Sequence, residues 1–372
     1  MTAPIELTVG PIAHGGHWVA RHDGRVVFVR HALAGERVLA RVTDAGKSRF
    51  WRADAIEVLE PSPDRVEPAC PIAGRCGGCD FQHVDPAAQR ALKTAVLAEQ
   101  LQRLAGITWT GAVREVPGGP LGWRTRMRYR TDEQGRLAMR AHRSHDLVPL
   151  PEQGCAIAAR TIPTQGWPAG AEVDVVGRAV LVDGHLRKGP ETLTEEAAGR
   201  PWQVAADGFW QVHPRAADVL AEAVVDALDP EAGERALDLY CGVGLFAGVL
   251  AERGVEVQGV ESNPATVALA AHNVPAGEFL AGRVERTMSR LWRRADLVVL
   301  DPPRAGAGRA VVEQVVRRRP RAVAYVACDP AALARDLGHF LELGYDLTGL
   351  RAFDLFPMTH HIEAVAQLVP RD

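Results

Sequence analysis

The stretch that decides the fold is RALDLYCGVGLFAGVLAERGVEVQGVESNP, residues 235–264. It predicts an apolar strand, a glycine turn, a helix and a second strand that ends in Glu261. Gly242 and Gly244 allow the backbone to approach a ligand, and Glu261 stands where it can bind two ribose hydroxyls. From about residue 201 onward, apolar strands alternate with amphipathic helices, which indicates a parallel α/β sheet.

The charge beside the turn indicates its ligand. A dinucleotide-binding turn has the pattern G-x-G-x-x-G, but the third glycine here, Gly248, comes one residue late, and Asp238 precedes the turn. A carboxylate beside the turn attracts a cationic ligand and repels a phosphate group. The pattern therefore favours S-adenosylmethionine over NAD. A βαβ unit without any ligand would leave Asp238, Gly242, Gly244 and Glu261 unexplained.

A second loop is predicted at the same edge of the sheet. The segment DLVVLDPPRAGAG, residues 296–308, places Asp301 at the end of a strand, and two prolines then stiffen the loop. An Asp-Pro-Pro-aromatic loop would suggest methylation of a base amino group. The fourth residue here is Arg304, so amino methylation is the weaker interpretation.

A candidate nucleophile ends the next strand, RAVAYVACDPAALARDL, residues 321–337. Asp329 and Pro330 are the predicted N-cap and first residue of a helix directly behind Cys328. A helix N-terminus stabilises an anion, so we expect the pKa of Cys328 to fall below the ordinary value of ~8.5. The alternative is a buried apolar cysteine, and that is our interpretation of Cys241.

A thiolate beside a methyl donor fits methylation at carbon 5 of a pyrimidine. That carbon is a poor nucleophile until carbon 6 has been attacked, so addition of Cys328 to C6 would activate C5. A base must then remove the C5 proton before the thiolate can leave. The segment FDLFPMTHHIEAVAQLV, residues 353–369, supplies Glu363 as a candidate, with His360 and His361 close by.

Cysteines also cluster in ACPIAGRCGGCDFQHVD, residues 69–85. Cys70, Cys76 and Cys79 form C-x5-C-x2-C, and Cys155 is the one further cysteine outside the catalytic part. Four thiolates can hold zinc or an iron-sulfur cluster. Three close cysteines and one remote one favour iron-sulfur over zinc, with a structural role for the cluster.

Composition sets the class of protein. At ~150 residues per domain, the 372 residues predict two or three domains. Hydrophobic residues make up 47%, yet no stretch approaches the ~20 apolar residues that a membrane span needs. The start, MTAPIELTVG, lacks the pattern of a secretory signal, so we expect a reducing cytoplasm and no disulfides among the six cysteines.

Net charge gives no sign of a polyanionic partner, since 43 basic and 46 acidic residues leave −3. The local signal is GWRTRMRYR, in which Arg124, Arg126, Arg128 and Arg130 alternate with other residues. On a strand, this period of two places the four guanidinium groups on one face, where they can bind RNA phosphates. A solvated strand face is the alternative.

The remaining segments complete the domain plan. Residues 5–60 alternate short β-type runs with turns and predict a small β-barrel, and a proline-rich link, residues 61–71, follows it. Residues 85–106 predict an amphipathic helix. We therefore expect a barrel over 1–60, a central domain over 61–200 and a catalytic domain over 201–372.

The motifs DLYCGVGLF, LDPPRAGAG, VACDPAALARDL and FPMTHHIE together resemble those of the RNA uracil-5 methyltransferase family. The resemblance extends over nearly the whole chain. It implies a Rossmann-like class I methyltransferase domain, an α+β iron-sulfur domain, and, through HGGHWVARHDGRVVFVRHALAGERV, an OB-like TRAM barrel that binds RNA. Related cytosine-5 enzymes carry a Pro-Cys nucleophile in the loop that reads DPPR here, so the resemblance favours uracil.

The resemblance also assigns site residues. It implies that Gln211, Tyr240, Glu261 and Asp301 bind the donor, that Cys328 is the nucleophile and Glu363 the base. It implies a 4Fe-4S cluster on Cys70, Cys76, Cys79 and Cys155. Leu245 stands where some relatives have Asn, and Tyr240 where some have Phe.

Three function classes follow from these observations. The leading interpretation is a monomeric cytoplasmic enzyme, with no membrane association, that methylates C5 of a uridine in RNA. Its substrate is expected to be 23S ribosomal RNA, with the T-loop uridine of transfer RNA as the alternative. The other classes are a non-catalytic RNA-binding factor that keeps the fold and an iron-sulfur oxidoreductase that uses a nicotinamide. Intact Cys328 and Glu363 argue against the non-catalytic factor.

Overall fold

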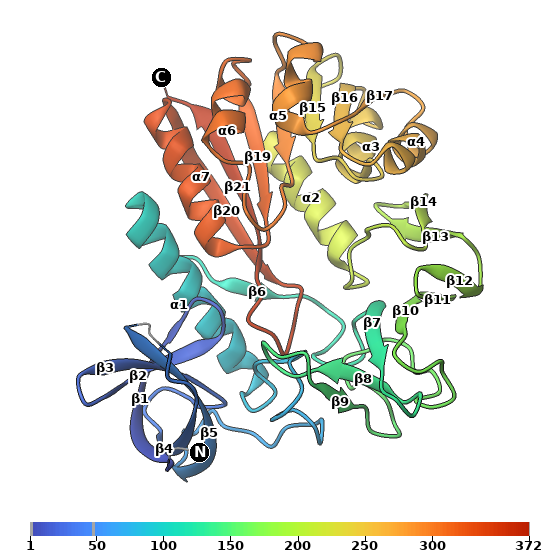
Figure 1. Cartoon of the computed structure of the whole chain (residues 1–372). Coiled ribbons are helices and arrows are strands. Elements are labelled where there is room, and N and C mark those ends of the chain that lie inside the picture. The colour runs from blue at the N-terminus through green and yellow to red at the C-terminus, as the bar shows by residue number, and fades with distance from the viewer. Residues whose placement is uncertain (1–2, 47–48, 372) are drawn as a thin grey trace.

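The computed structural model describes residues 3–46 and 49–371, and Figure 1 shows its architecture. The barrel predicted at the start of the chain is confirmed, as a closed barrel with strand order β1-β2-β3-β5-β4. Alternate residues of its strands point inward, and the fully buried Trp18 lies in its core. The strands are β1 (Ile5–Ala13), β2 (His17–His22), β3 (Arg25–Arg30), β4 (Arg37–Asp44) and β5 (Phe50–Glu60).

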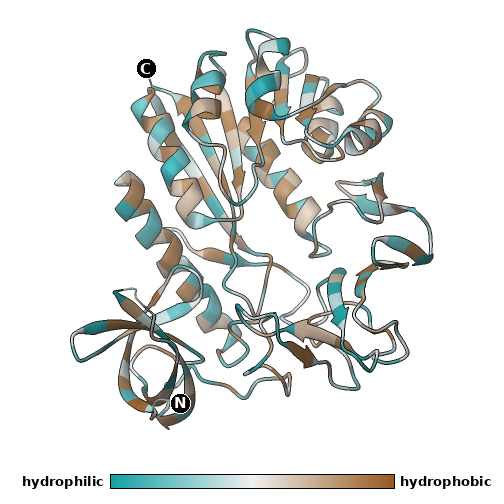
Figure 2. Ribbon diagram, in the orientation of Figure 1, coloured by the Kyte–Doolittle hydropathy of each residue, from teal (hydrophilic) through white to brown (hydrophobic). Residues whose placement is uncertain are grey.

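The catalytic part is built on an eight-stranded sheet with the order β17-β16-β15-β18-β19-β21-β20-β6. The decisive stretch of sequence forms β15, a glycine turn, α3 and β16, as predicted. The central strands of the large sheet are runs of apolar residues, because helices cover both faces of the sheet. In Figure 2 these strands are brown and lie between helices. The strands are β6 (Val113–Glu115), β15 (Arg235–Leu239), β16 (Glu256–Glu261), β17 (Glu278–Ala281), β18 (Leu297–Leu300), β19 (Ala322–Ala327), β20 (Tyr345–Asp354) and β21 (Glu363–Pro370).

The predicted parallel α/β sheet is present, with one antiparallel strand that the sequence did not predict. β17, β16, β15, β18 and β19 run parallel, but β21 is antiparallel to both of its neighbours, β19 and β20. The physical reason is the short connection over residues 355–362, because a parallel pair needs a crossover of about a dozen residues or more. The start of β21 therefore lies at the same edge as the ends of the parallel strands.

Helices pack on this sheet through apolar faces. α7 buries Leu333, Leu337 and Phe340 against the same core that holds the inner residues of β18 and β19. The helices are α2 (Ala216–Leu228), α3 (Leu245–Ala251), α4 (Pro264–Asn273), α5 (Val284–Thr287), the 3-10 turn η1 (Met288–Arg290), α6 (Arg309–Val316) and α7 (Pro330–Glu342).

Helix α1 (Pro86–Ala105) joins the barrel to the catalytic part. The Asp85 side chain caps its first turn, and Gly106 ends it in the left-handed conformation. Val96 packs into the barrel core, whereas Leu97 and Leu101 pack into the core of the large sheet beneath α7. Figure 1 shows α1 between these two parts.

The middle of the chain forms a six-stranded sheet, β12-β11-β10-β7-β8-β9, and a separate hairpin, β13-β14. The segment 61–200 is not one structural unit, because its α1 and β6 pack onto the large sheet. The hairpin likewise crosses the expected boundary at 200. The strands are β7 (Arg126–Thr131), β8 (Leu137–Arg140), β9 (Leu147–Pro149), β10 (Glu172–Val176), β11 (Ala179–Val182), β12 (His185–Lys188), β13 (Thr192–Ala197) and β14 (Arg200–Ala205).

Candidate active site

The predicted site residues of the catalytic part gather at one edge of the large sheet. β16, β15, β18 and β19 are consecutive neighbours, and their carboxyl ends meet at this edge. Asp238 lies near the end of β15, Glu261 ends β16, Asp301 follows β18 and Cys328 follows β19. Segments 90 residues apart in the chain (238 to 328) therefore meet at one edge of the sheet, where open α/β sheets bind ligands in a crevice outside the strand ends.

Glu363 reaches the same edge through the antiparallel strand. In the register of β19 and β21, Ala327 pairs with Ala364, so Cys328 and Glu363 stand opposite one another at the next position. Glu363 is the neighbouring charge with the largest effect on the Cys328 thiol. The predicted nucleophile and the predicted base are thus side by side.

Asp238 is the buried acid of the glycine turn. Its side chain is fully buried; Oδ2 accepts a hydrogen bond from the Ala247 N–H at 2.9 Å, and Oδ1 has no hydrogen-bond partner among the residues that the structure describes. Burial, with Asp301 and Glu261 nearby, raises the pKa of Asp238 from 3.8 to about 7. A cation beside Oδ1 would satisfy that oxygen and stabilise the ionised form.

The turn after Asp238 has an open backbone. Tyr240 and Gly242 both have positive φ, at 67° and 53°, and a Cβ added to Gly242 would meet no atom within 4 Å. Glu261 is oriented by two hydrogen bonds to its Oε1, from the Ser262 hydroxyl at 2.7 Å and the Asn263 N–H at 2.9 Å. Gln211 lies in the loop before α2 and is half-buried. The open turn and the oriented Glu261 can line a ligand, whereas no contact of the described residues joins Gln211 to the turn.

Cys328 does not have the low pKa that its helix predicts. Asp329 caps α7 as expected, with Oδ1 accepting from the Ala332 N–H at 2.8 Å, and Pro330 is the first helical residue. Even so, burial and then Glu363 and Asp301 raise the pKa of Cys328 from 9.0 to about 12. The prediction of a depressed pKa is wrong, because burial and two neighbouring carboxyls outweigh one helix terminus.

Glu363 and Asp301 form an acidic pair behind the thiol. Burial raises the pKa of Asp301 to about 7. Burial and then Asp301 raise the pKa of Glu363 well above its ordinary value, while Arg304 lowers it. Arg304 also lowers the pKa of Cys328, so this guanidinium favours the ionised form of both groups.

Sequence reasoning missed Asp336, which holds the loop after Asp301. Its carboxylate accepts from the Ala307 N–H at 2.7 Å, the Gly308 N–H at 3.2 Å and the Tyr325 hydroxyl. A Cβ at Gly306 would lie 2.6 Å from this carboxylate. The available signal was an acid inside the apolar stripe of α7, between Leu333 and Phe340.

His361 and His360 lie beside these groups but differ in their contacts. Burial, with His360 and Arg304, lowers the pKa of His361 to about 3, so its ring is neutral. Its Nε2 lies 3.3 Å from the Arg304 guanidinium, which only donates, so His361 accepts this hydrogen bond. His360 Nδ1 lies 2.6 Å from the Asp80 carboxylate.

The four predicted cysteine ligands line one cavity of about 240 Å³, although Cys155 is 76 residues beyond Cys79. Burial raises the pKa of Cys76 to about 11 and of Cys79 to about 12. The Gly78 N–H donates to Cys76 Sγ at 3.3 Å. Within residues 3–46 and 49–371, no group of three or more His, Cys, Asp or Glu side chains is arranged to hold a metal ion, so a metal centre here stays a prediction.

The four arginines at 124, 126, 128 and 130 form only part of the RNA-binding strand face that their spacing predicts. Met127 and Tyr129 point into the core, as expected, but Arg124 precedes β7 and lines the cysteine cavity. Across the strand pair, β10 places carboxylates opposite Arg128 and Arg130. Arg128 pairs with Asp174 at 2.7 Å and also lies 3.5 Å from Glu172, which pairs with Arg130 at 2.6 Å. Arg126 instead pairs with Glu195 of β13 at 3.5 Å.

Comparison with known proteins identifies the family. The chain is 48% identical to an uncharacterized RNA methyltransferase of Streptomyces avermitilis, over 100% of this chain and 99% of that protein. It is 32% identical to the 23S rRNA (uracil(1939)-C(5))-methyltransferase RlmD of Shewanella sp. strain MR-4, over 98% and 96%. The chain belongs to the RNA uracil-5 methyltransferase family.

Models of protein families match three parts of this RNA methyltransferase. The TRAM domain matches residues 4–56, the methyltransferase small domain matches 214–324, and the tRNA (uracil-5-)-methyltransferase model matches 285–370. The last of these contains Asp301, Cys328 and Glu363. The TRAM match coincides with the closed barrel.

A solved structure supports the fold of the methyltransferase over its whole length. The Pyrococcus abyssi tRNA (uracil-54, C5)-methyltransferase, in complex with S-adenosyl-L-homocysteine, is similar with a TM-score of 0.73 and 22% identity, over 98% of this chain and 100% of that one. The catalytic part thus has the class I methyltransferase fold. In the part of the chain that the structure describes, no helix is long and apolar enough to cross a membrane.

Proposed function

We propose that this enzyme transfers a methyl group from S-adenosylmethionine to C5 of a uridine in RNA, with 23S ribosomal RNA as the substrate. The observation that carries the proposal is the pair Cys328 and Glu363, opposite one another on adjacent strands beside the crevice that contains Asp238 and Asp301. A thiol and a carboxyl so arranged fit a base whose C6 is attacked and whose C5 loses a proton.

The crevice suits the proposed donor. When bound, S-adenosylmethionine supplies an electrophilic methyl group on a positively charged sulfur. The unpartnered Asp238 Oδ1 and the buried carboxyl of Asp301 are complementary to that charge. We assign donor binding to these acids together with the open glycine turn and the oriented Glu261; the full set is Gln211, Asp238, Tyr240, Gly242, Gly244, Glu261 and Asp301.

Cys328 is the proposed nucleophile. Its sulfur bonds to C6 of the uracil, the C5–C6 double bond is lost, and the electron pair moves to C5 and O4 as an enolate. C5 then takes the methyl group as its bond to the donor's sulfur breaks, and S-adenosylhomocysteine is the leaving group. The thiol must first lose its proton, and because its pKa is about 12 in the ligand-free protein, a cationic donor and Arg304 are needed to offset the carboxyls.

Glu363 is the proposed base. After methylation it removes the C5 proton, the C5–C6 double bond re-forms, and the thiolate is expelled from C6. This requires an ionised carboxylate, although burial favours the protonated form. Arg304, which His361 holds at 3.3 Å, is the cation that offsets this burial.

Two variants test this assignment. Cys328→Ala should abolish methyl transfer and leave S-adenosylhomocysteine affinity unchanged, because the thiol acts on the base. Glu363→Gln should form the C6 adduct and fail to resolve it, giving a protein–RNA band that survives denaturation. Full activity of the Cys328 variant would refute the nucleophile, and absence of any adduct would count against Glu363.

The RNA target is assigned by resemblance, so it needs its own measurement. The relative RlmD acts on 23S rRNA, and the Pyrococcus relative acts on tRNA, which leaves the T-loop uridine as the alternative. Mass-spectrometric mapping of 5-methyluridine in both RNAs, from cells with and without the gene, distinguishes the two candidate substrates.

The arginines of β7 are the proposed phosphate contacts. Arg128 and Arg130 have side chains that are 67% and 37% exposed, whereas Arg124 and Arg126 are more enclosed.

We further propose that the cysteine cavity holds a 4Fe-4S cluster. A single tetrahedral ion at about 2.3 Å from each sulfur would bring the sulfurs to about 3.8 Å of one another. A cluster spreads them further, since each thiolate binds a different iron. Four cysteines around one cavity of about 240 Å³ suit the second arrangement. Iron and acid-labile sulfide, measured on anaerobically purified protein and on Cys155→Ser, test it; zinc alone would refute it.

A further inference from the structure

We propose that Asp80, the residue after Cys79, is a positioning residue for the loop over residues 355–362, and that it thereby keeps His361 and Arg304 in place beside Glu363 and Cys328. The inference rests on the proposed function, since it concerns the groups that act there. Residues 70–84 carry three of the cysteines. In this proposal the same segment also holds in place the loop that precedes Glu363. Asp80 does not touch the proposed substrate site, so its effect is transmitted through the loop.

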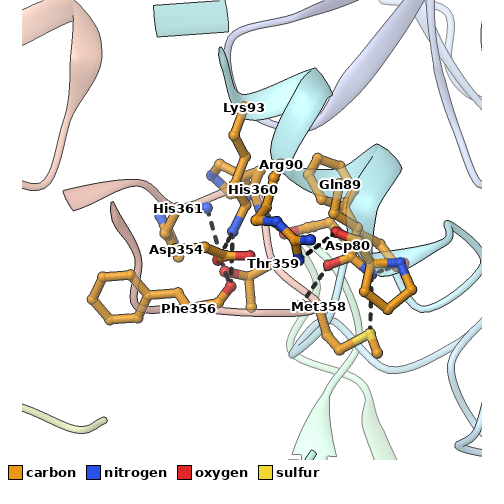
Figure 3. Close-up of polar contacts among 12 residues, drawn as sticks. Asp80, Gln89, Arg90, Lys93, Asp354, Phe356, Met358, Thr359, His360 and His361 are labelled. Atoms are coloured by element: carbon orange, nitrogen blue, oxygen red, sulfur yellow. Dashed lines mark hydrogen bonds and ion pairs between the residues drawn. The ribbon is translucent and has the colours of Figure 1, made fainter. Parts of the chain in front are cut away.

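Backbone contacts fix the middle of this loop. The N–H groups of Asp80 and Phe81 both donate to the Met358 carbonyl at 3.0 Å. Gln89 of α1 accepts from the Met358 N–H at 2.9 Å and donates to the Phe81 and Val84 carbonyls at 3.1 and 2.9 Å. Met358 itself has a φ of 67°, a conformation that needs such support. Figure 3 shows Asp80, Gln89 and Met358 close together, with dashed lines that mark contacts of Met358.

The Asp80 side chain then holds the next part of the loop. Its Oδ2 accepts from His360 Nδ1 at 2.6 Å and from the His360 N–H at 3.3 Å. The carboxylate is only 12% exposed. Both the ring and the backbone of His360 are therefore fixed by one carboxylate.

From His360, packing leads to the reacting groups. The ring of His360 lies 4.2 Å from that of His361, centroid to centroid. His361 accepts from Arg304 at 3.3 Å, and Arg304 favours the ionised forms of Glu363 and Cys328. Three successive contacts thus lead from Asp80 to Arg304, whose charge acts on the reacting groups. Loss of its carboxylate would free the His360 ring, and with it the acceptor that orients Arg304.

The first part of the loop has a separate anchor. Lys93 of α1 donates to Asp354 at 2.6 Å and to the Phe356 carbonyl at 3.0 Å, and the Thr359 hydroxyl donates to the same carbonyl at 2.8 Å. These contacts do not involve Asp80. Removal of the Asp80 side chain should therefore loosen residues 360–361 without unfolding the loop.

The experiment compares Asp80→Ala, Asp80→Asn and the control Asp85→Ala in the full chain. Asp85 lies five residues on and caps α1, so its loss weakens the same region without contact to the loop. Hydrogen exchange of the peptide containing residues 358–361, the affinity for S-adenosylhomocysteine, and kcat and KM on RNA are measured for each. Asp80→Ala should speed exchange and lower kcat at least tenfold, with donor affinity within twofold. Asp80→Asn, which keeps an oxygen acceptor, should recover part of kcat.

Several outcomes would overturn the inference. One is a wild-type kcat in Asp80→Ala; another is unchanged exchange at 358–361. Equal losses of kcat in Asp80→Ala and Asp85→Ala would show that Asp80 only stabilises the fold, and would also overturn the inference. Failure of the proposed function would appear differently, as absence of 5-methyluridine in the product of the unmodified enzyme.

Discussion

Asp238 shows how far single residues can be interpreted from sequence. Its position before a glycine turn predicts an acid beside a cationic ligand, and the structure places it at the crevice with one oxygen unpartnered. Its complete burial and raised pKa are not readable from sequence, because they depend on what α3 and β18 pack around it. The same limit explains the error at Cys328, where the helix was visible in the sequence but the opposing carboxyls were not.

We expect Asp238→Asn to stabilise the ligand-free protein at alkaline pH and to weaken donor binding. The folded protein holds the Asp238 proton up to a pKa of about 7, against 3.8 for an ordinary Asp. The folded state therefore binds more protons between these values, and its stability falls as pH rises through that window. At about 1.4 kcal/mol for each pKa unit, the free energy of unfolding falls by about 4 kcal/mol by pH 8.

Thermal melts at pH 5 and pH 8, and calorimetry with S-adenosylmethionine, check this expectation. The variant should melt above the unmodified protein at pH 8 and above it by a smaller margin at pH 5. Asp207→Asn, which changes an exposed acid in a turn, is the control and should alter neither quantity. A variant with the same pH slope as the unmodified protein would contradict the account of the buried acid.

The Cys328 thiol should respond to the charge of the donor. With a pKa of about 12, it should react slowly with iodoacetamide at pH 8. S-adenosylmethionine brings a cationic sulfur that S-adenosylhomocysteine lacks, and the two are otherwise nearly the same size. We therefore expect the first ligand to speed alkylation of Cys328, read by peptide mass spectrometry, and the second to leave it slow. Equal rates with both ligands would show that the donor charge does not control the thiol.

Individual helices and strands were easier to predict from the sequence than the strands and cores against which they pack. The unit around residues 235–264 and the helix after Asp85 were readable because their apolar period and caps are local. The antiparallel insertion of β21 was not, since strand order depends on long-range pairing. Helix α1 shows the same limit: its apolar residues predict a helix but do not reveal that Val96 faces the barrel and Leu97 the large sheet.

The buried ion pair between α1 and β20 should be costly to break. Lys93 and Asp354 are 1% and 6% exposed and lie 2.6 Å apart. Lys93→Met would leave Asp354 without its cation, which typically destabilises a fold by about 3–5 kcal/mol. The double variant Lys93→Met with Asp354→Leu should recover much of that loss, because no lone charge remains.

Denaturant melts of the single and double variants measure the effect. Arg371→Met breaks an exposed pair with Asp346 and is the matched control, expected to leave the melt unchanged. If the double variant is no more stable than Lys93→Met, the loss lies in packing and not in the unpaired carboxylate.

At the scale of the whole molecule, the barrel contributes to the surroundings of the active site. The His14 ring lies 3.1 Å from Asp329, the residue next to Cys328. Gly16, at φ +75°, lies so close to His360 that a Cβ there would be 2.8 Å from that side chain's Cβ. The sequence predicted the barrel from its alternating strands, but no local pattern indicates which surface its β1–β2 turn meets.

We expect Gly16→Ala to lower kcat more than Gly15→Ala does. Both glycines have positive φ, so both substitutions carry similar backbone strain, but a Cβ at Gly15 would meet only His17, at 3.7 Å. The difference between the two variants isolates the contact with His360. Steady-state kinetics on RNA, with Tm as a check on folding, measure it; equal kcat values would mean that the turn only lies near the loop.

The place of β21 also sets the order in which the site can form during synthesis. β21 is made after the other strands, yet it pairs between β19 and β20. Until it inserts, both neighbours present unpaired backbone edges to other chains, which is the condition under which nascent proteins aggregate. Cys328 also has no carboxyl partner from β21 before that moment. The insertion of β21 is therefore the same event that brings Glu363 opposite Cys328, the proposed base and the proposed nucleophile.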